Sequence, residues 1–550
     1  MLKSLRGSLR GDCVAGLTVW AVLVPEALAY ASIAGVSPVV GLYAASGALI
    51  LYAVFGSSRQ LIVGPMAATA ALSAAAVGTL AAGNSGVFTA LTITVAITVG
   101  VIALVAGLLR LGFVANFISE PVMKGFIVGL ALTIIIGQAP KLLGVEKGSG
   151  NFFQQLWTVL SHLGHTQWRT LLAGLISLAI VLGLRRWLPV VPAPLVAVAV
   201  GVLAVYALHL DKHGVKIVGH IDSGLPSFGF PSVPSGDYLK LAGPAVGIML
   251  VGFAEGLGAA RTYAAKNGYE ISPNSELIGL GAANVAAGLS SGMVVNGSLS
   301  KTAVNGAAGA RTQVSGLVVA ALTILTLLFL TGLFQDLPEA TLGAVVIAAL
   351  IELVDISALR SLYRVHSTRL GRIYGHAARA DFIAAAAALL GVLIFDTLPG
   401  LFIGISMSLL LLVYRSSRPH VARLGRAPGN DQWTDTDHYP EDTTIPGITV
   451  LRVEAGLFFA NADYVRTAVT RAASRRPAPY AVILDCETVP FVDVTAARML
   501  DQLTADLHGR GIRLVIAREI GQVRDVLSAT GPTPEYFPSV RAAVGVVGHG

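Results

Sequence analysis

Two apolar segments of the chain contain glycine, proline and hydroxyl side chains that interrupt them. They are residues 64–69 (GPMAAT) and residues 296–302 (NGSLSKT). Each predicts a helix that begins partway through an apolar layer, where its first N–H groups and its positive dipole end attract anions. If the two ends face each other, they form an anion seat together with the hydroxyls of Ser298 and Ser300 and the ammonium of Lys301. The residues predicted for this anion seat are Pro65, Met66, Ala67, Ser298, Leu299, Ser300 and Lys301. The simpler alternative is close helix packing by small residues.

Two carboxylates lie inside long apolar stretches, where an ionised group is costly and therefore indicates a function. Glu255 is expected near the anion seat, either as a proton carrier or as the partner of Lys301. Glu26 follows Pro25 at the equivalent place in the first half of the chain, so both are candidates for binding the coupling ion. For both, a structural hydrogen bond to a neighbouring helix is the alternative.

The composition places these groups in a membrane. Of 550 residues, 54% are hydrophobic and 13% are charged, and the mean hydropathy is +0.72, whereas soluble proteins carry about 25% charged residues. Charge is scarce up to Tyr414 and ordinary after it. Because about 20 apolar residues cross the hydrocarbon layer as a helix, we predict fourteen spans. They are Cys13–Ser37, Val39–Phe55, Gly64–Leu80, Val87–Leu109, Pro121–Ala139, Leu171–Leu184, Pro192–Leu210, Leu241–Ala260, Ile278–Leu289, Ser298–Gly309, Gly316–Gln335, Leu342–Leu353, Phe382–Phe395 and Thr397–Tyr414.

Basic residues set the predicted orientation. Lys and Arg gather at alternate ends of successive spans, among them the cluster Arg360–Arg379, and the positive-inside rule then puts both termini in the cytoplasm. Two longer outside loops are exceptions to the rule. The first contains Lys141, Lys147 and Arg169, and the second contains Lys212, Lys216 and Lys240.

The two interrupted segments are each third in a group of seven spans. Paired interrupted spans at corresponding positions are typical of inverted-repeat transporters, whose site lies between the halves. We therefore expect a membrane transport domain over residues 1–414.

The remainder of the chain has a different pattern. After a polar linker, residues 415–446, the strands Ile448–Val453, Tyr480–Leu484 and Arg513–Ala517 alternate with the helices Ala462–Ala473 and Ala496–His508. This order predicts a small α/β domain over residues 447–550.

At these segments the chain resembles the SulP anion permeases, also called solute carrier family 26. The resemblance is carried by Gly16–Tyr43, Gly56–Pro65, Gly112–Gly144, Ile221–Pro231, Gly252–Gly279 and Ser298–Gly316, in the family's order. It implies a polytopic helical fold of two inverted seven-span repeats, divided into core and gate domains, and a homodimer in the plasma (inner) membrane. It also implies alternating-access transport of a small anion such as sulfate, bicarbonate or a dicarboxylate, coupled to protons or sodium through Glu255.

Many relatives have Gln where this chain has Glu26, and many animal members have Arg where it has Lys301. Lysine lacks the planar fork of arginine, so inference about the anion from animal members is weak.

The C-terminal part resembles a STAS domain, through Leu457–Ala462 and the stretch from Val482 to Asp493. In sporulation-type STAS proteins a phosphorylated serine follows the second aspartate. Here Val494 occupies that position, which favours a structural or regulatory role.

The residues leave alternatives open and exclude other classes. A passive anion channel and a nucleobase permease of the same fold remain possible functions, although nucleobase permeases place a carboxylate near the position of Lys301. We expect no enzymatic activity, cofactor, metal site or nucleic-acid partner, and we expect Cys13 and Cys486 to be unpaired thiols.

Overall fold

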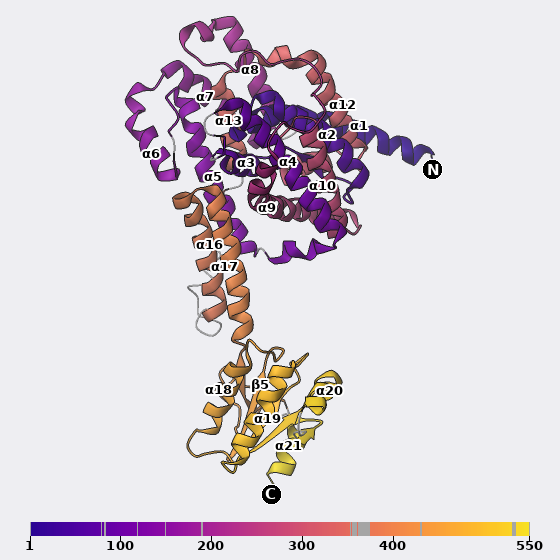
Figure 1. Cartoon of the computed structure of the whole chain (residues 1–550), viewed down its shortest axis with the longest axis vertical. Helices are drawn as coiled ribbons and strands as arrows, with labels where there is room; N and C mark the ends of the chain where they lie inside the picture. The colour runs from indigo at the N-terminus through magenta and orange to yellow at the C-terminus, as the bar shows by residue number, and fades with distance from the viewer. Residues whose placement is uncertain are drawn as a thin grey trace. The chain divides into compact units, whose positions relative to one another are not determined.

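The computed structural model describes residues 2–548 except for 79, 82–83, 118, 149, 189–190, 352–353, 355–359, 361–374, 430–431 and 531–534. The chain divides into two compact units, Met1–Leu409 and Leu410–Gly550 (Figure 1). The membrane prediction applies to the first unit and the α/β prediction to the second.

The first unit is helical, and each of the fourteen predicted spans coincides with a helix. Within the described residues, eight helices are long and apolar enough to cross a membrane by length and composition. The helices that correspond to spans are α1 (Leu2–Ala34), α2 (Pro38–Phe55), α3 (Ala67–Gly78), α4 (Ser85–Leu108), α5 (Glu120–Leu143), α7 (Trp168–Trp187), α8 (Ala193–Leu208), α9 (Ser235–Asn267), α10 (Pro273–Leu289), α11 (Leu299–Ala307), α12 (Val314–Leu325), α13 (Glu339–Ile351), α16 (Gly375–Phe395) and α17 (Thr397–Ser417).

Shorter elements join these helices. They are η1 (Leu111–Phe117), α6 (Phe152–Ser161), η2 (Leu163–His165), η3 (Leu210–His213), η4 (Thr326–Leu330) and η5 (Thr331–Phe334). The predicted basic cluster Arg360–Arg379 and the end of the twelfth predicted span, Leu353, lie largely outside the described residues.

The two halves of this unit share one unusual feature. In each half the third span is a short helix preceded by a three-residue strand, β1 (Ile62–Gly64) before α3 and β2 (Asn296–Ser298) before α11. The strands pair antiparallel, so the two short helices leave the pair from opposite ends. This arrangement fits the predicted inverted repeat.

The helices pack as a core group and a gate group. In the core group, α10 packs on α2 and α4, α1 on α12, and α9 on α4, α3 and α11. In the gate group, α5 packs on α16, α13 and α7, and α7 packs on α8. Figure 1 shows α3 among the core helices, with α5, α7 and α13 side by side.

Glycine allows close backbone contacts between these helices, as α4 and α10 illustrate. A Cβ atom on Gly100 of α4 would lie 2.6 Å from the backbone nitrogen of Val285 in α10. A Cβ atom on Gly281 of α10 would lie 2.7 Å from the backbone nitrogen of Leu104. The backbones of α4 and α10 therefore touch, as small residues allow between helices in membranes.

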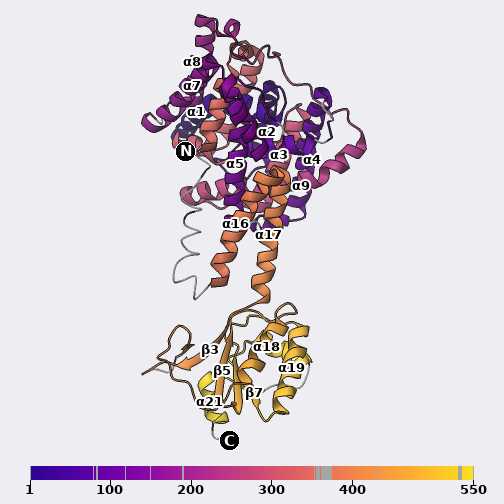
Figure 2. The same ribbon diagram turned by 90° about the vertical axis from the view of Figure 1, so that its left-hand side faces the viewer.

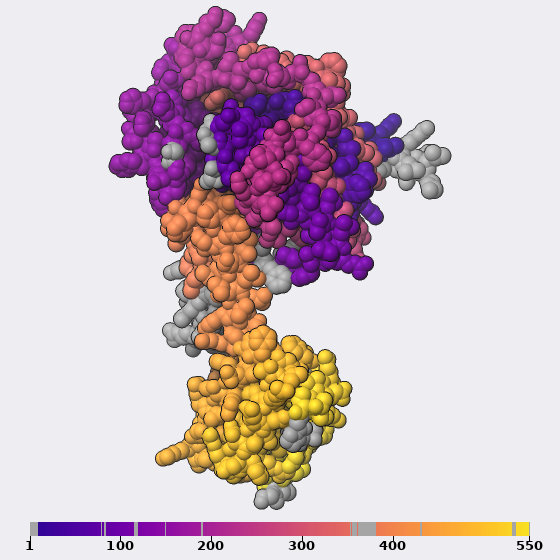
Figure 3. Space-filling model, viewed as in Figure 1, coloured from indigo at the N-terminus to yellow at the C-terminus, as the bar shows by residue number. Residues whose placement is uncertain are grey.

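Large apolar side chains cover the outer surface of the helices. On α17 they include Leu410, Leu412 and Val413, and this part of the chain is drawn in orange in the space-filling view (Figure 3). On α4 they include Val101 and Leu108. In water such a surface would be unfavourable, whereas lipid solvates it.

The second unit is a six-stranded sheet covered by helices. Its strands are β3 (Val421–Arg426), β4 (Trp433–Asp435), β5 (Ile448–Val453), β6 (Ala481–Asp485), β7 (Arg513–Ala517) and β8 (Glu535–Phe537), in the order β4-β3-β5-β6-β7-β8. The helices are α18 (Ala462–Ala473), α19 (Val494–His508), α20 (Gly521–Thr530) and α21 (Val540–Val547). Strands β5 to β8 are parallel, and β3 pairs antiparallel with β5 and β4.

Alternate residues of the strands build two cores. Leu451, Val482 and Leu484 point toward α18, α19 and α20, whereas Val450 and Ile483 point toward α21. Figure 2 shows α18 and α19 on one side of the sheet and α21 on the other.

One predicted boundary is wrong. Residues 415–446 were expected to form a polar linker, but α17 continues to Ser417 and β3 and β4 are strands of the sheet. Ala422 and Leu424 are buried in the core under α21. The sequence hides these strands because β3 pairs antiparallel with both of its neighbours and carries Arg423 and Arg426, which gives it a polar composition.

Candidate functional site

The strand pair places the starts of α3 and α11 next to each other. Ile62 lies opposite Ser298, and Gly64 lies opposite Asn296. The Ser298 hydroxyl caps α11 by accepting a hydrogen bond from the backbone N–H of Lys301 at 3.2 Å, which serine is suited to do at this position. On the other side, Gly64 and Pro65 lead into α3, where the first N–H groups have no carbonyl of their own helix to bind.

Lys301 joins the two halves of this arrangement. Its side chain is 1% exposed, and its Nζ donates a long hydrogen bond of 3.4 Å to the carbonyl oxygen of Pro65. Nζ also lies 5.1 Å from the centre of the Tyr30 ring, within the range of a cation–π contact. A cation from α11 thus reaches the beginning of α3.

The counter-charge of Lys301 is Glu26. The Glu26 Oε2 atom in α1 lies 2.7 Å from Lys301 Nζ, with both side chains buried. The contact is a close ion pair between two buried charges. Arg185 of α7 approaches the other oxygen of Glu26 at 3.9 Å. A carboxylate of the core group is therefore shared between a core lysine and an arginine of the gate group.

Glu255 of α9 lies beside strand β2. Its Oε2 accepts a hydrogen bond of 3.1 Å from Asn296 in β2, and its side chain is half-buried. The expectation that Glu255 could be the partner of Lys301 is therefore wrong in this structure, because Glu26 occupies that position. Glu255 contacts the strand before α11, and Glu26 contacts the helix itself.

The predicted seat residues lie together but differ in exposure. Ser298 and Pro65 are buried, whereas Leu299 and Ser300 are exposed. The Ser300 hydroxyl is 3.2 Å from that of Ser298. Met66 is half-buried at the start of α3. The seat is therefore open on the side of Leu299 and Ser300, with Lys301 beneath it.

A buried carboxylate that the sequence did not indicate holds the chain before β1. Glu276 of α10 is fully buried and accepts hydrogen bonds from Tyr52 Oη at 2.8 Å, Ser57 Oγ at 2.6 Å, and the N–H groups of Ser57 and Ser58, both at 2.9 Å. In the sequence, Glu276 is visible only as an acidic residue in the first turn of a helix. An acid at that position is already explained by the positive end of the helix dipole, so its hydrogen bonds to the chain before β1 could not be predicted.

Side chains of the second repeat hold the rest of this segment. Asn305 Nδ2 donates to the carbonyl of Gln60 at 2.9 Å, and the Thr302 hydroxyl accepts from the N–H of Ile62 at 3.1 Å. Gln313 Nε2 donates to the carbonyls of Ser58 and Leu61 at 2.8 and 3.0 Å. The start of β1 is thus fixed by α10, α11 and α12, which makes the seat rigid.

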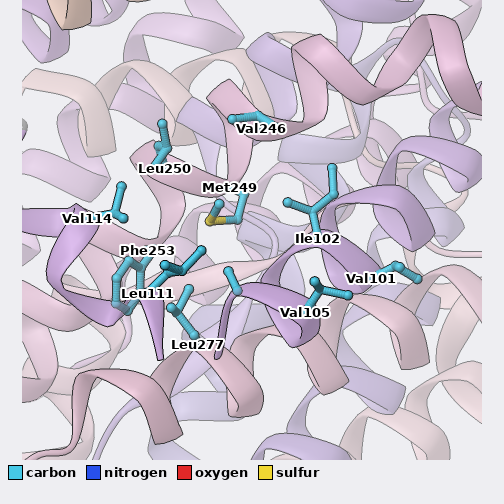
Figure 4. A pocket seen from close by; sticks show the side chains of 11 residues that line it. Val101, Ile102, Val105, Leu111, Val114, Val246, Met249, Leu250, Phe253 and Leu277 are labelled. Carbon is cyan, nitrogen blue, oxygen red and sulfur yellow. The ribbon is translucent and has the colours of Figure 1, made fainter. Parts of the chain in front are cut away.

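A large apolar pocket lies apart from this seat. It has a volume of about 410 Å³ between α4, η1, α9 and α10, and it is lined only by apolar side chains, among them Val105, Met249 and Phe253 (Figure 4). An anion placed there would lose its hydration without gaining a hydrogen bond, which is strongly unfavourable. The small-anion site must therefore be sought where polar groups converge.

Comparison with known proteins agrees with this architecture. The model of the sulfate permease family matches residues 9–371, and that of the STAS domain matches residues 439–543. A probable sulfate transporter of Mycobacterium tuberculosis (strain CDC 1551 / Oshkosh) is 38% identical over 522 residues, covering 95% of this chain and 91% of the relative. Sulfate transporter 1.3 of Arabidopsis thaliana is 34% identical, covering 92% and 79%.

Solved structures show the same fold. The murine anion transporter Slc26a9 in its inward-facing state superimposes with a TM-score of 0.87 at 23% identity, covering 98% of this chain and 91% of that one. The transmembrane domain of the cyanobacterial bicarbonate transporter BicA gives 0.62 at 23% identity, covering 72% and 97%. The fold of the chain is thus a helical membrane domain of this type, followed by a STAS domain.

Proposed function

The chain belongs to the sulfate permease family, and on that premise we propose that it is a secondary active transporter of small anions. The candidate substrates are sulfate, bicarbonate and dicarboxylates. The names of the similar proteins from Mycobacterium tuberculosis and Arabidopsis thaliana favour sulfate. The single observation that carries the proposal is the buried ammonium of Lys301 at the meeting point of two half-helices.

The anion seat supplies the groups that an oxyanion needs. Lys301 gives a full positive charge, and Ser300 gives an exposed hydroxyl. The starts of α3 and α11 add backbone N–H groups and two positive dipole ends. Charge-assisted hydrogen bonds of this kind are stronger than neutral ones. The anion enters from the exposed side, at Leu299 and Ser300, and binds above Lys301.

The Glu26–Lys301 pair suggests how a proton accompanies the anion. When Glu26 is ionised, it neutralises the cation that the anion requires. When Glu26 binds a proton, Lys301 keeps its full charge for the anion. Anion and proton therefore bind together and cross together, which is the definition of symport. Glu255, bonded to Asn296 beside the same seat, is the second candidate for this role, and sodium is the alternative coupling ion.

Alternating access is the proposed movement. The seat and Glu26 belong to the core group, whereas Arg185 belongs to the gate group. Rigid movement of one group against the other would expose the seat to one side of the membrane and then to the other. We place the protein in the plasma (inner) membrane as a homodimer, with both termini and the STAS domain in the cytoplasm.

Uptake into proteoliposomes tests the function. Labelled sulfate, bicarbonate and a dicarboxylate are supplied with and without an inward proton gradient. We expect uptake of at least one anion to be accelerated by the gradient and competed by the others. Counterflow of labelled substrate against its own gradient separates a transporter from a passive channel. Absence of uptake for all three anions, with monodisperse protein, contradicts the proposal.

A further inference from the structure

The two outside loops that break the positive-inside rule meet at one pocket. The pocket has a volume of about 220 Å³, and polar and apolar residues line it together. Lys141 at the end of α5 and Lys147 come from the first loop region, and Lys216 comes from the second. The other polar side chains that line it are Glu146, Gln167, Thr170 and Glu339. Charges that looked scattered in the sequence are thus gathered around one space.

The three lysines form no close ion pair, although the carboxylate of Glu339 attracts Lys141 from the wall of the same pocket. Among the described residues, none of Lys141, Lys147 and Lys216 forms an ion pair within 4.0 Å or a side-chain hydrogen bond. With two glutamates in its wall, the pocket keeps a net charge of +1. The position of Lys141 in the last turn of α5 suits the helix dipole, but Lys147 and Lys216 lie on loops and have no such reason to be there.

Backbone hydrogen bonds hold the walls of the pocket in place. The N–H of Glu339 donates to the carbonyl of Lys216 at 2.9 Å, and the N–H of Gln167 donates to that of Leu143 at 2.9 Å. One hydrogen bond therefore joins the start of α13 to the loop with Lys216, and the other joins the end of α5 to the start of α7. A cavity with such walls is preformed, and preformed sites bind ligands with a smaller entropic cost.

Chain connectivity places this pocket at the end of the membrane helices where α17 begins. Asn151, in the loop after Lys147, donates from Nδ2 to the carbonyl of Ile394 at the end of α16. From there α17 begins at Thr397 and runs to Ser417, so it crosses the layer once more. With the proposed cytoplasmic STAS domain, the pocket opens to the outside. It is built from gate helices, whereas the anion seat belongs to the core.

We propose that this pocket is a second anion-binding site, which captures a small oxyanion such as sulfate at the outer face. Its volume corresponds to about seven water molecules at roughly 30 Å³ each, enough for a tetrahedral oxyanion with part of its hydration shell. Lys141, Lys147 and Lys216 donate charge-assisted hydrogen bonds, and Gln167 adds an amide donor. The two glutamates repel the bound anion and weaken its binding, which suits release of the anion toward the seat.

Equilibrium binding of radiolabelled sulfate to the purified full chain tests the site without requiring transport. A Lys301→Ala background removes the anion seat, and sulfate binding that remains reports the pocket. We expect the Lys147→Gln/Lys216→Gln pair in that background to weaken the remaining binding by about tenfold or more. In the wild-type background, the same pair should reduce the stoichiometry from two sulfates to one, which keeps the test valid if Lys301→Ala does not fold.

Lys212→Gln is the matched control, because Lys212 lies in the same loop region as Lys216 but does not line the pocket. It removes the same charge and should leave sulfate binding unchanged. Equal weakening by Lys212→Gln would mean that general surface charge, not the pocket, binds the anion. Unchanged binding in the Lys147→Gln/Lys216→Gln protein, or no remaining binding in Lys301→Ala with a stoichiometry of one in wild type, also overturns the proposal. Failure of transport in proteoliposomes bears on the proposed function alone.

Discussion

Glu26 Oε2 in α1 and Lys301 Nζ in α11 lie 2.7 Å apart, and their side chains are 2% and 1% exposed. The two residues are 275 positions apart and belong to different repeats. Their contact joins the first helix of one repeat to the half-helix of the other at the place where an anion is proposed to bind. The counter-ion of the binding lysine is therefore built into the protein.

Lys301→Ala should weaken both anion binding and stability. Loss of one charged hydrogen bond raises the apparent KM for sulfate about tenfold or more. The buried Glu26 then keeps only the more distant Arg185 at 3.9 Å, and the loss of its close partner costs about 3–5 kcal/mol of unfolding free energy. The pair Glu26→Gln/Lys301→Met should recover most of the stability but not the affinity, as measured by thermal unfolding and uptake kinetics. Unchanged KM in a folded Lys301→Ala protein would remove Lys301 from the seat.

Glu26→Gln should abolish the acceleration of uptake by an inward proton gradient. The sequence favoured Glu255 for this role, but the contact with Lys301 makes Glu26 the carboxylate that competes directly with the anion. Uptake is measured at fixed voltage while the outside pH is stepped downward. Glu255→Gln is the comparison variant. If only Glu255→Gln loses the response, the coupling carboxylate is the one bonded to Asn296.

Glu276→Gln should destabilise the membrane domain. The amide keeps one acceptor but turns a donor toward groups that themselves donate, among them Tyr52 and Ser57. We expect a loss of about 2 kcal/mol or more, seen as a lower Tm in detergent. Glu270→Gln, at an exposed position before the same helix, is the control. Equal unfolding temperatures for the two variants would contradict the role given to Glu276.

The effect of removing the STAS domain on monodispersity and transport should depend on where the chain is cut. Deletion of residues 447–550 leaves β3 and β4 without the partner strand β5, and unpaired strands of this kind promote aggregation. Deletion of residues 418–550 ends the chain just after α17. We expect the shorter product to be monodisperse and to retain reduced transport. Size-exclusion chromatography measures whether each product is monodisperse, and uptake into proteoliposomes measures its transport. Complete loss of transport by a monodisperse product would contradict the prediction and show that the domain is essential.

Cys486 should resist alkylation in the folded protein. Burial, together with the nearby carboxylates of Asp485 and Glu519, raises the pKa of its thiol well above the ordinary value. The reactive species is the thiolate, so maleimide should label Cys486 only after unfolding in denaturant. The Cys13→Ser variant leaves Cys486 as the one cysteine in the chain and makes the measurement specific. Rapid labelling at neutral pH without denaturant would contradict the buried position.

The sequence by itself determined the architecture because its signals are local. Apolar runs of span length, the two interrupted segments and the alternation of basic loops depend on neighbouring residues only. Strands Ile448–Val453 and Arg513–Ala517 were likewise predicted, because parallel strands buried on both faces are continuous apolar runs. β3 was missed because it pairs antiparallel with β4 and β5 and carries the polar residues Arg423 and Arg426, so it is not a continuous apolar run.

Only the tertiary structure decided which charges meet. Composition and position made Glu26 and Glu255 equivalent, because each is a carboxylate in the first span of a repeat. The packing of α1 against α11 places Glu26 in an ion pair with Lys301. The strand β2 places Asn296 where it donates a hydrogen bond to Glu255. Glu276 and the pocket of Lys141, Lys147 and Lys216 were hidden for the same reason. Helix packing brings together groups that are far apart in the chain, and no local pattern records the rotation and register that decide such contacts.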